Sequence, residues 1–129
     1  KPQPATKVIA WMALQAAADL YTAGMTQAEI LHGLMLLPPG RRRSALEAAA
    51  TAMFEDDSGR ILGSGSEVAP TYARIASDRR RAGRPISHFD AQIAAIAGFM
   101  GAAVATRNTA DFDGCGVTQV DPWNPHDSL

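Results

Sequence analysis

Apolar residues recur at three- and four-residue intervals along several stretches of the chain, which is the spacing that predicts amphipathic helices. The predicted helices cover residues 5–18, 26–37, 41–54, 67–82 and 88–100. The second helix ends before Pro38-Pro39-Gly40, and the last begins after Ser87 as its cap and ends at Gly101. Because proline fits only the first helical turn, Pro70 should delay the start of the fourth helix.

Short apolar runs lie between these helices and predict strands. The four predicted strands are residues 20–23, 60–62, 102–105 and 117–120, the second of them following a turn at 56–59. Strands that alternate with helices indicate a parallel sheet covered on both faces, a three-layer α/β/α architecture. Residues 1–129 are therefore expected to form a single α/β domain with about four strands.

Composition narrows the class of protein. The chain has 129 residues, 47% of them hydrophobic, with 12 Lys and Arg against 13 Asp and Glu. This balance excludes global disorder, and any binding to nucleic acid must come from local basic clusters. A single cysteine, Cys115, excludes an internal disulfide. The lone cysteine indicates a reducing cytoplasm, and no apolar run is long enough to span a bilayer, so no membrane association is expected.

Three segments that follow predicted strands or open predicted helices each carry a carboxylate. They are Thr26–Glu29, Ser87–Asp90 and Thr106–Asp111. The carboxyl ends of parallel strands and the adjoining helix starts lie on one edge of a sheet, so these segments should converge. Mg²⁺ prefers oxygen ligands, and such a cation can activate water for phosphodiester cleavage. The pattern therefore indicates a candidate metal site.

Helix capping is the competing interpretation of the same residues. Glu29 could complete a capping box with Thr26, and Asp90 could do the same with Ser87. Asp111 could simply begin a turn. Capping is favoured for each carboxylate taken alone, whereas clustered carboxylates repel one another and favour a bound cation when taken together.

Basic and aromatic residues give weaker indications. The runs Arg41–Arg43 and Arg79–Arg81 could bind an RNA backbone, but solvated helix ends are the favoured interpretation of both. Arg84 and Arg107 lie nearer the predicted acidic edge and are better candidates for guiding a phosphate. Trp11 and Trp123 are expected in the core or in an interface, because 6% aromatic residues do not predict a base-stacking surface.

Several segments resemble a known family. They are Thr26-Gln27-Ala28-Glu29-Ile30, residues 84–97 with the run FDAQIAAIA, residues 104–112 with ATRN followed by DF, and the ending Val120-Asp121-Pro122-Trp123. Across essentially the whole chain these segments are similar to PIN-domain ribonucleases, most closely to the VapC and FitB toxins of bacterial toxin–antitoxin pairs. The resemblance implies a PIN-like three-layer fold.

The same resemblance implies an activity and its residues. It implies an endoribonuclease dependent on Mg²⁺ or Mn²⁺, neutralised by a cognate antitoxin and forming a homodimer. By position in the family motifs, Glu29, Asp90 and Asp111 are the implied catalytic and metal-binding residues. The implied substrate-binding residues are Thr106, Arg107, Asn108 and Arg84.

One family motif has no match in this sequence. The family begins with a central strand that ends in Asp-Thr-Asn, and Lys1-Pro2-Gln3-Pro4 corresponds to the segment just after it. An upstream segment outside this sequence is the favoured explanation, ahead of a strand from another chain or an inactive truncated product. A sheet without that strand is expected to leave backbone groups unpaired on two neighbouring strands.

Two other functions remain open at this point. A catalytically inactive module could dimerise and bind an antitoxin-like peptide through the alanine-rich faces of the second and third helices. A phospho-accepting domain would need a lysine after a late strand. Lysine occurs only at positions 1 and 7, which disfavours that second alternative.

Overall fold

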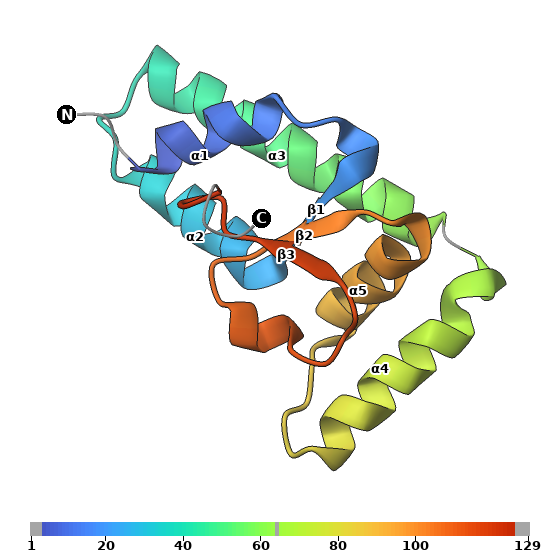
Figure 1. The fold of residues 1–129 in the computed structure, drawn as a ribbon. Coiled ribbons are helices and arrows are strands. Elements are labelled where there is room, and N and C mark those ends of the chain that lie inside the picture. Colours follow the sequence, from blue (N-terminus) through green and yellow to red (C-terminus); the bar gives the residue numbers. More distant parts are fainter. Residues whose placement is uncertain (1–3, 64, 126–129) are drawn as a thin grey trace.

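A computed structural model describes residues 4–63 and 65–125. In chain order its helices and strands are α1 (Pro4–Ala13), β1 (Leu20–Thr22), α2 (Gly24–Met35), α3 (Arg41–Leu62), α4 (Ala69–Arg81), α5 (His88–Met100), β2 (Ala103–Ala105) and β3 (Thr118–Val120) (Figure 1). Three short 3-10 helices complete the description, η1 (Ala17–Asp19), η2 (Ser66–Val68) and η3 (Thr109–Phe112).

The strands form one parallel sheet in the order β1-β2-β3, with Tyr21 level with Val104 and Val104 level with Gln119. Helices α1, α2 and α3 lie on one side of this sheet, and α4 and α5 lie on the other (Figure 1). Each side has its own apolar cluster, one around Ile30 and Leu34 and the other around Ile93 and Val104. The predicted three-layer α/β/α class is therefore confirmed.

The predicted strand at residues 60–62 is wrong, and the sheet has three strands in the described part of the chain. These residues end α3, which continues through the turn expected at 56–59. The helix buries Phe54, Asp57 and Ile61, whose spacing of three and four residues keeps one face against the rest of the domain. The short apolar run at 60–62 thus continues a helical stripe.

Helix ends differ from the predictions where local signals compete. Helix α1 ends at Ala13, five residues early, and α2 begins at Gly24 without a side-chain cap. Helix α4 begins at Ala69 with Pro70 in its first turn, as the proline predicts. Helix α5 matches its prediction: the backbone N–H of Asp90 donates to Ser87 Oγ at 3.1 Å, and Gly101 ends the helix at φ +70°.

The backbone of β1 has hydrogen-bond partners along both edges, which differs from the expectation of an unpaired edge. It pairs directly with β2, and Ala23 N continues the ladder by donating to Ala105 O at 3.0 Å. Along the other edge, Thr22 N donates to Asp57 Oδ2 and Arg60 Nη2 donates to Leu20 O, each at 2.8 Å. Lys1-Pro2-Gln3, next to which the family's first strand is expected, lies outside the described residues.

Helix α1 packs closely on α2 at a glycine. A Cβ at Gly33 would lie 2.7 Å from Ala5 Cβ, so we expect Gly33→Ala to lower the free energy of unfolding by about 1 kcal/mol, because overpacking exceeds the gain in helix propensity. Gly59→Ala is the matched control: beyond the adjoining backbone of its own helix, nothing lies within 4 Å of the added Cβ, and we expect stabilisation. Urea unfolding measures both, and a stabilised Gly33→Ala would contradict the close packing.

No helix in residues 4–63 or 65–125 combines the length and the apolar character needed to cross a bilayer.

Candidate functional site

Two helix starts meet at the edge of the sheet where β1 ends. The backbone N–H of Gly24, the first residue of α2, donates to Asp90 Oδ1 at 3.0 Å, which joins α2 to the first turn of α5. Asp90 therefore uses its carboxylate across the fold, while only the Ser87 half of the expected capping box forms. A carboxylate between two helix N-termini also lies where the helix dipoles favour negative charge.

Glu29 lies one turn further along α2 and contacts the segment after β2. Its Oε2 forms an ion pair with Arg107 Nη1 at 3.3 Å, and both side chains are partly exposed. The Thr26 hydroxyl is buried and accepts a hydrogen bond from Arg107 N at 3.2 Å. The predicted capping box of Thr26 and Glu29 is therefore wrong, because both side chains bind the segment that leaves β2.

Arg107 also stacks on an aromatic ring. Its guanidinium carbon lies 4.5 Å from the centroid of the Trp123 ring. The Trp123 backbone N–H donates to Asp121 Oδ1 at 2.9 Å, which fixes the turn after β3. Trp123 packs against the apolar cluster, as expected of a core or interface residue, but its contact with Arg107 was not predicted. The only signal available was its place in the family-like ending.

The remaining predicted residues after β2 build the loop that carries η3. Thr106 is buried and its hydroxyl donates to Asn108 O at 3.2 Å. Asn108 Oδ1 accepts from Ala110 N at 3.1 Å and so caps η3. Asp111 lies within η3 and is half-buried. Thr106 and Asn108 thus position this loop through their side chains.

Arg84 and Arg79 also hold the η3 loop in place. Arg84 Nη2 donates to Ala110 O at 2.8 Å and forms an ion pair with Asp113 at 3.2 Å. Arg79 is buried, and its guanidinium donates to the carbonyls of Arg84 at 2.7 Å and Asp113 at 2.9 Å. Interpreting Arg79 as a solvated helix end was therefore wrong, since it is a buried crosslink between α4 and the η3 loop.

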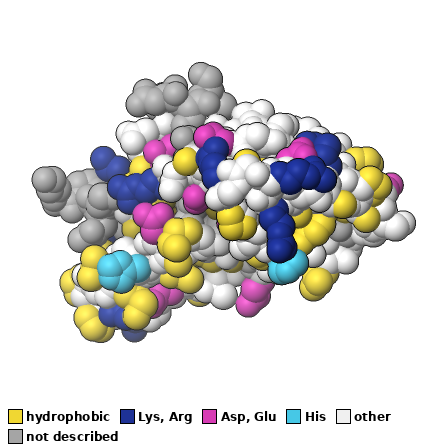
Figure 2. Space-filling model, turned by 90° about the horizontal axis from the view of Figure 1, so that it is seen from below, with side chains coloured by type: hydrophobic (Ala, Val, Ile, Leu, Met, Phe, Trp, Pro, Cys, Tyr) yellow, Lys and Arg dark blue, Asp and Glu magenta, His cyan; other side chains and the backbone are white. Residues whose placement is uncertain are grey.

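The described residues do not assemble the implied three-carboxylate metal centre. Within residues 4–63 and 65–125 no group of three or more His, Cys, Asp and Glu side chains could hold a metal ion. Arg107 balances the charge of Glu29 through their ion pair, and the Gly24 N–H stabilises the Asp90 carboxylate through a hydrogen bond. On the face seen in Figure 2, Lys and Arg side chains are interspersed with Asp and Glu side chains. Glu29 lies on α2 and Asp90 is hydrogen-bonded to the start of α2, but the described residues do not form a three-ligand metal site.

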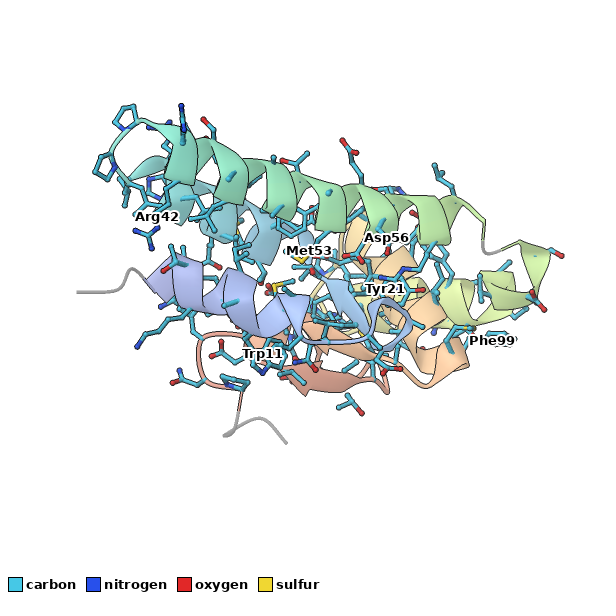
Figure 3. The ribbon with its side chains drawn as sticks, turned by 90° about the horizontal axis from the view of Figure 1, so that it is seen from above. Trp11, Tyr21, Arg42, Met53, Asp56 and Phe99 are labelled. Atoms are coloured by element: carbon cyan, nitrogen blue, oxygen red, sulfur yellow. The ribbon has the colours of Figure 1, made fainter. Side chains whose placement is uncertain are left out.

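A second polar group, which the sequence analysis missed, lies beside β1. Asp57 is buried and forms an ion pair with Arg60, whose guanidinium carbon lies 3.9 Å from the centroid of the Tyr21 ring. Burial is the main cause that raises the pKa of Asp57 above 3.8, against the hydrogen bond from Thr22 and the charge of Arg60. A pocket between α1, β1 and α3 opens over this pair, with Met53 and Asp56 among its lining residues (Figure 3).

Burial also raises the pKa of the Cys115 thiol, and the nearby charges of Arg79 and Arg74 only partly oppose it. A thiol with a raised pKa is a poor nucleophile at neutral pH. Cys115 therefore contributes to the core, as its place in the apolar cluster indicates.

These observations define a three-layer α/β/α domain with two acidic helix segments meeting at the carboxyl edge of a parallel sheet. The chain belongs to the PIN-domain family, whose model, described as "PIN domain", matches residues 2–114. The family resemblance drawn from the sequence motifs is thereby confirmed.

Curated relatives cover nearly the whole chain. The chain is 32% identical to VapC ribonuclease Y4jK of Sinorhizobium fredii, over 97% of this chain and 90% of the relative. It is 34% identical to Toxin FitB of Neisseria gonorrhoeae, over 96% and 90%. It is 35% identical to plasmid stability protein StbB of Pseudomonas syringae pv. tomato, over 94% and 88%.

Two solved structures are similar in sequence and in fold. The crystal structure of FitAcB from Neisseria gonorrhoeae matches with a TM-score of 0.56 and 35% identity, covering 95% of this chain and 89% of the other. The structure of FitAB bound to an IR36 DNA fragment matches with a TM-score of 0.56 and 34% identity, covering 95% and 87%.

Proposed function

We propose that the protein is a ribonuclease toxin of a toxin–antitoxin pair, acting in the cytoplasm as a homodimer and neutralised by a cognate antitoxin. Membership of the PIN family and the names of its relatives, a VapC ribonuclease and Toxin FitB, support this function. The observation that carries it is the hydrogen bond from Gly24 to Asp90, which brings the acid of α5 to the start of α2, the helix that bears Glu29.

Cleavage of RNA would take place at this edge of the sheet. Asp90 and Glu29 are the proposed catalytic residues, with Asp111 from the η3 loop as the third. Arg107 is partly exposed beside Glu29 and is the proposed contact for a substrate phosphate. Thr106, Asn108 and Arg84 would act through the loop that they hold in place.

The family resemblance implies Mg²⁺ or Mn²⁺ at these carboxylates, where such an ion would supply an activated water for phosphodiester hydrolysis. The described residues do not fit a three-ligand centre, because Glu29 is paired with Arg107 and no group of three ligands forms among them.

The test is cleavage of single-stranded RNA by the purified protein with Mg²⁺, with Mn²⁺ and with EDTA. We expect cleavage that needs the divalent ion and that falls about a hundredfold in Asp90→Asn and in Glu29→Gln, while the fold is retained. Asp78→Asn, an exposed carboxylate on α4, is the control and should cleave at the wild-type rate. Wild-type rates in both site variants would contradict the assignment.

The second candidate function is a catalytically inactive PIN module that dimerises and binds an antitoxin. Its specific support is that no three-ligand group forms in the part of the chain that the structure describes. Calorimetric titration with Mg²⁺ separates the two functions. A saturable heat that disappears in Asp90→Asn supports the nuclease, and the absence of both heat and cleavage supports the module.

A further inference from the structure

Arg107 lies between an anion and an aromatic face, at a point where two strand ends meet. Its guanidinium contacts Glu29 Oε2 at 3.3 Å and lies over the Trp123 ring at 4.5 Å from the centroid. The Arg107 side chain is 51% exposed, so the guanidinium remains accessible from solvent while it makes both contacts.

The backbone on both sides of this contact is fixed by side-chain hydrogen bonds. Thr26 Oγ1 accepts from Arg107 N at 3.2 Å, which anchors the residue after β2 to α2. Asp121 Oδ1 accepts from Trp123 N at 2.9 Å, which anchors the turn after β3. The indole is half-buried and packs against the apolar cluster of α1, α2 and α3. The ring is therefore anchored by packing and by its backbone, whereas the guanidinium is held by contacts that solvent can reach.

The two contacts of the Arg107 guanidinium, with Glu29 and with Trp123, differ in whether they occupy its N–H donors. An ion pair between partly exposed side chains contributes little to stability, so Glu29 holds Arg107 only weakly. A cation–π contact with an aromatic face uses no N–H donor of the guanidinium, and its planar fork of N–H groups suits the paired oxygens of a phosphate. A phosphodiester can thus replace Glu29 without removing Arg107 from the ring.

We propose that Trp123 is a positioning residue, which holds Arg107 ready for a phosphodiester of single-stranded RNA, and that Glu29 occupies Arg107 until RNA displaces it. This inference rests on the proposed function, because it takes RNA as the ligand. The inference adds two points to the proposed function. Trp123, which lies outside the acidic edge, takes part in RNA binding, and Arg107 exchanges Glu29 for RNA. The Arg107–Glu29 ion pair and the contact of Arg107 with RNA therefore exclude each other.

The test is binding of a fluorescein-labelled single-stranded RNA, measured by anisotropy in EDTA so that metal-dependent cleavage plays no part. We expect Arg107→Gln to weaken binding about tenfold. Trp123→Leu, which keeps an apolar side chain but removes the aromatic face, should weaken it about threefold, and Trp123→Phe should remain within about twofold of the wild type. Glu29→Gln should tighten binding about threefold, because it removes the competing anion.

Double variants separate positioning from a merely structural role. In the Arg107→Gln background, Trp123→Leu and Glu29→Gln should each leave RNA affinity unchanged, because both act through the guanidinium. Trp11→Leu is the matched control, since Trp11 packs against the same apolar cluster, and it should bind RNA like the wild type. The salt dependence of binding should lose about one phosphate contact in Arg107→Gln.

The outcomes distinguish this inference from the proposed nuclease. Equal weakening by Trp123→Leu with and without Arg107 overturns it, as does wild-type affinity in Arg107→Gln or in Glu29→Gln. A wild type that does not bind RNA in EDTA also overturns it. Metal-dependent cleavage together with unaltered binding in these variants leaves the nuclease standing without the inference. Coupled binding effects without cleavage support the inference and exclude the nuclease.

Discussion

Replacing Asp57 by alanine is expected to lower the free energy of unfolding by about 3 kcal/mol, because it leaves a buried charge and a strand N–H without their partner. Asp57 is 4% exposed, accepts from Thr22 N at 2.8 Å and pairs with Arg60. Arg60 would keep its contact with the Tyr21 ring and its hydrogen bond to Leu20 O, which places the loss at the lower end of the range for broken buried pairs.

Asp56→Ala is the control for that experiment. Asp56 precedes Asp57 on α3 and also pairs with Arg60, at 3.4 Å, but its side chain is 54% exposed. Removing an exposed partner should change stability by less than about 1 kcal/mol. Urea unfolding followed by circular dichroism measures both variants, and equal effects would show that the buried position of Asp57 is unimportant.

The contribution of Asp57 to the free energy of unfolding should change with pH in one direction. Because burial raises the pKa of Asp57 above 3.8, the folded state holds its proton more tightly than the unfolded state does. The stability that this proton contributes is fully present below pH 3.8 and is lost as the pH rises through the folded-state pKa.

Asp57→Asn cannot titrate, so it isolates this effect from the other carboxylates. The free energy of unfolding of the wild type, minus that of Asp57→Asn, should fall as the pH rises through the weakly acidic range and then level off. Unfolding curves at a series of pH values measure this difference. A rising difference would mean that Arg60 and Thr22 outweigh burial.

The second large effect is expected at Arg79, where alanine should lower the free energy of unfolding by about 3 kcal/mol. Its guanidinium is buried and donates to the carbonyls of Arg84, Asp113 and Ala110 at 2.7, 2.9 and 3.3 Å. Alanine would remove the Arg79 donor from the carbonyls of Arg84 and Asp113, whereas Ala110 O would keep its hydrogen bond from Arg84. The link between α4 and the η3 loop would be lost. We therefore expect greater hydrogen exchange in residues 107–113 as well as a lower melting temperature.

Arg80→Ala is the matched control, because Arg80 is the next residue of α4 and is exposed. Its removal should change stability by less than about 0.5 kcal/mol and should leave exchange in the η3 loop unchanged. Comparable destabilisation by the two variants would contradict the role of Arg79 as a buried crosslink.

Elements with consistent local signals could be predicted from the sequence. Helix α5 has a serine cap, an apolar face and a terminal glycine that all agree, and the structure matches the prediction at both ends. At the end of α3, an apolar run and an apparent turn at 56–59 favoured a strand. There the tertiary contacts of Asp57 and Ile61 outweigh the local pattern, because a helix presents both residues to the rest of the domain.

For the candidate site, the predicted convergence of segments matches two contacts, the Arg107–Glu29 ion pair and the hydrogen bond that joins the start of α2 to Asp90, while the roles of these residues stay predictions. Motif position could not give their partners, since Gly24 and Asp90 are far apart in sequence and meet only through the parallel topology. Arg79 illustrates the same limit. Within a run of three arginines, composition alone does not show which side chain points inward, and only packing against the η3 loop decides it.

The closure of the outer edge of β1 by α3 side chains has a consequence for self-association. Exposed strand edges act as templates for pairing with other chains, and proteins protect such edges with charged residues. Asp57 and Arg60 already occupy the Thr22 N–H and the Leu20 carbonyl, so a foreign strand could dock there only by separating a buried ion pair. Aggregation by sheet extension is therefore disfavoured on this side of the molecule.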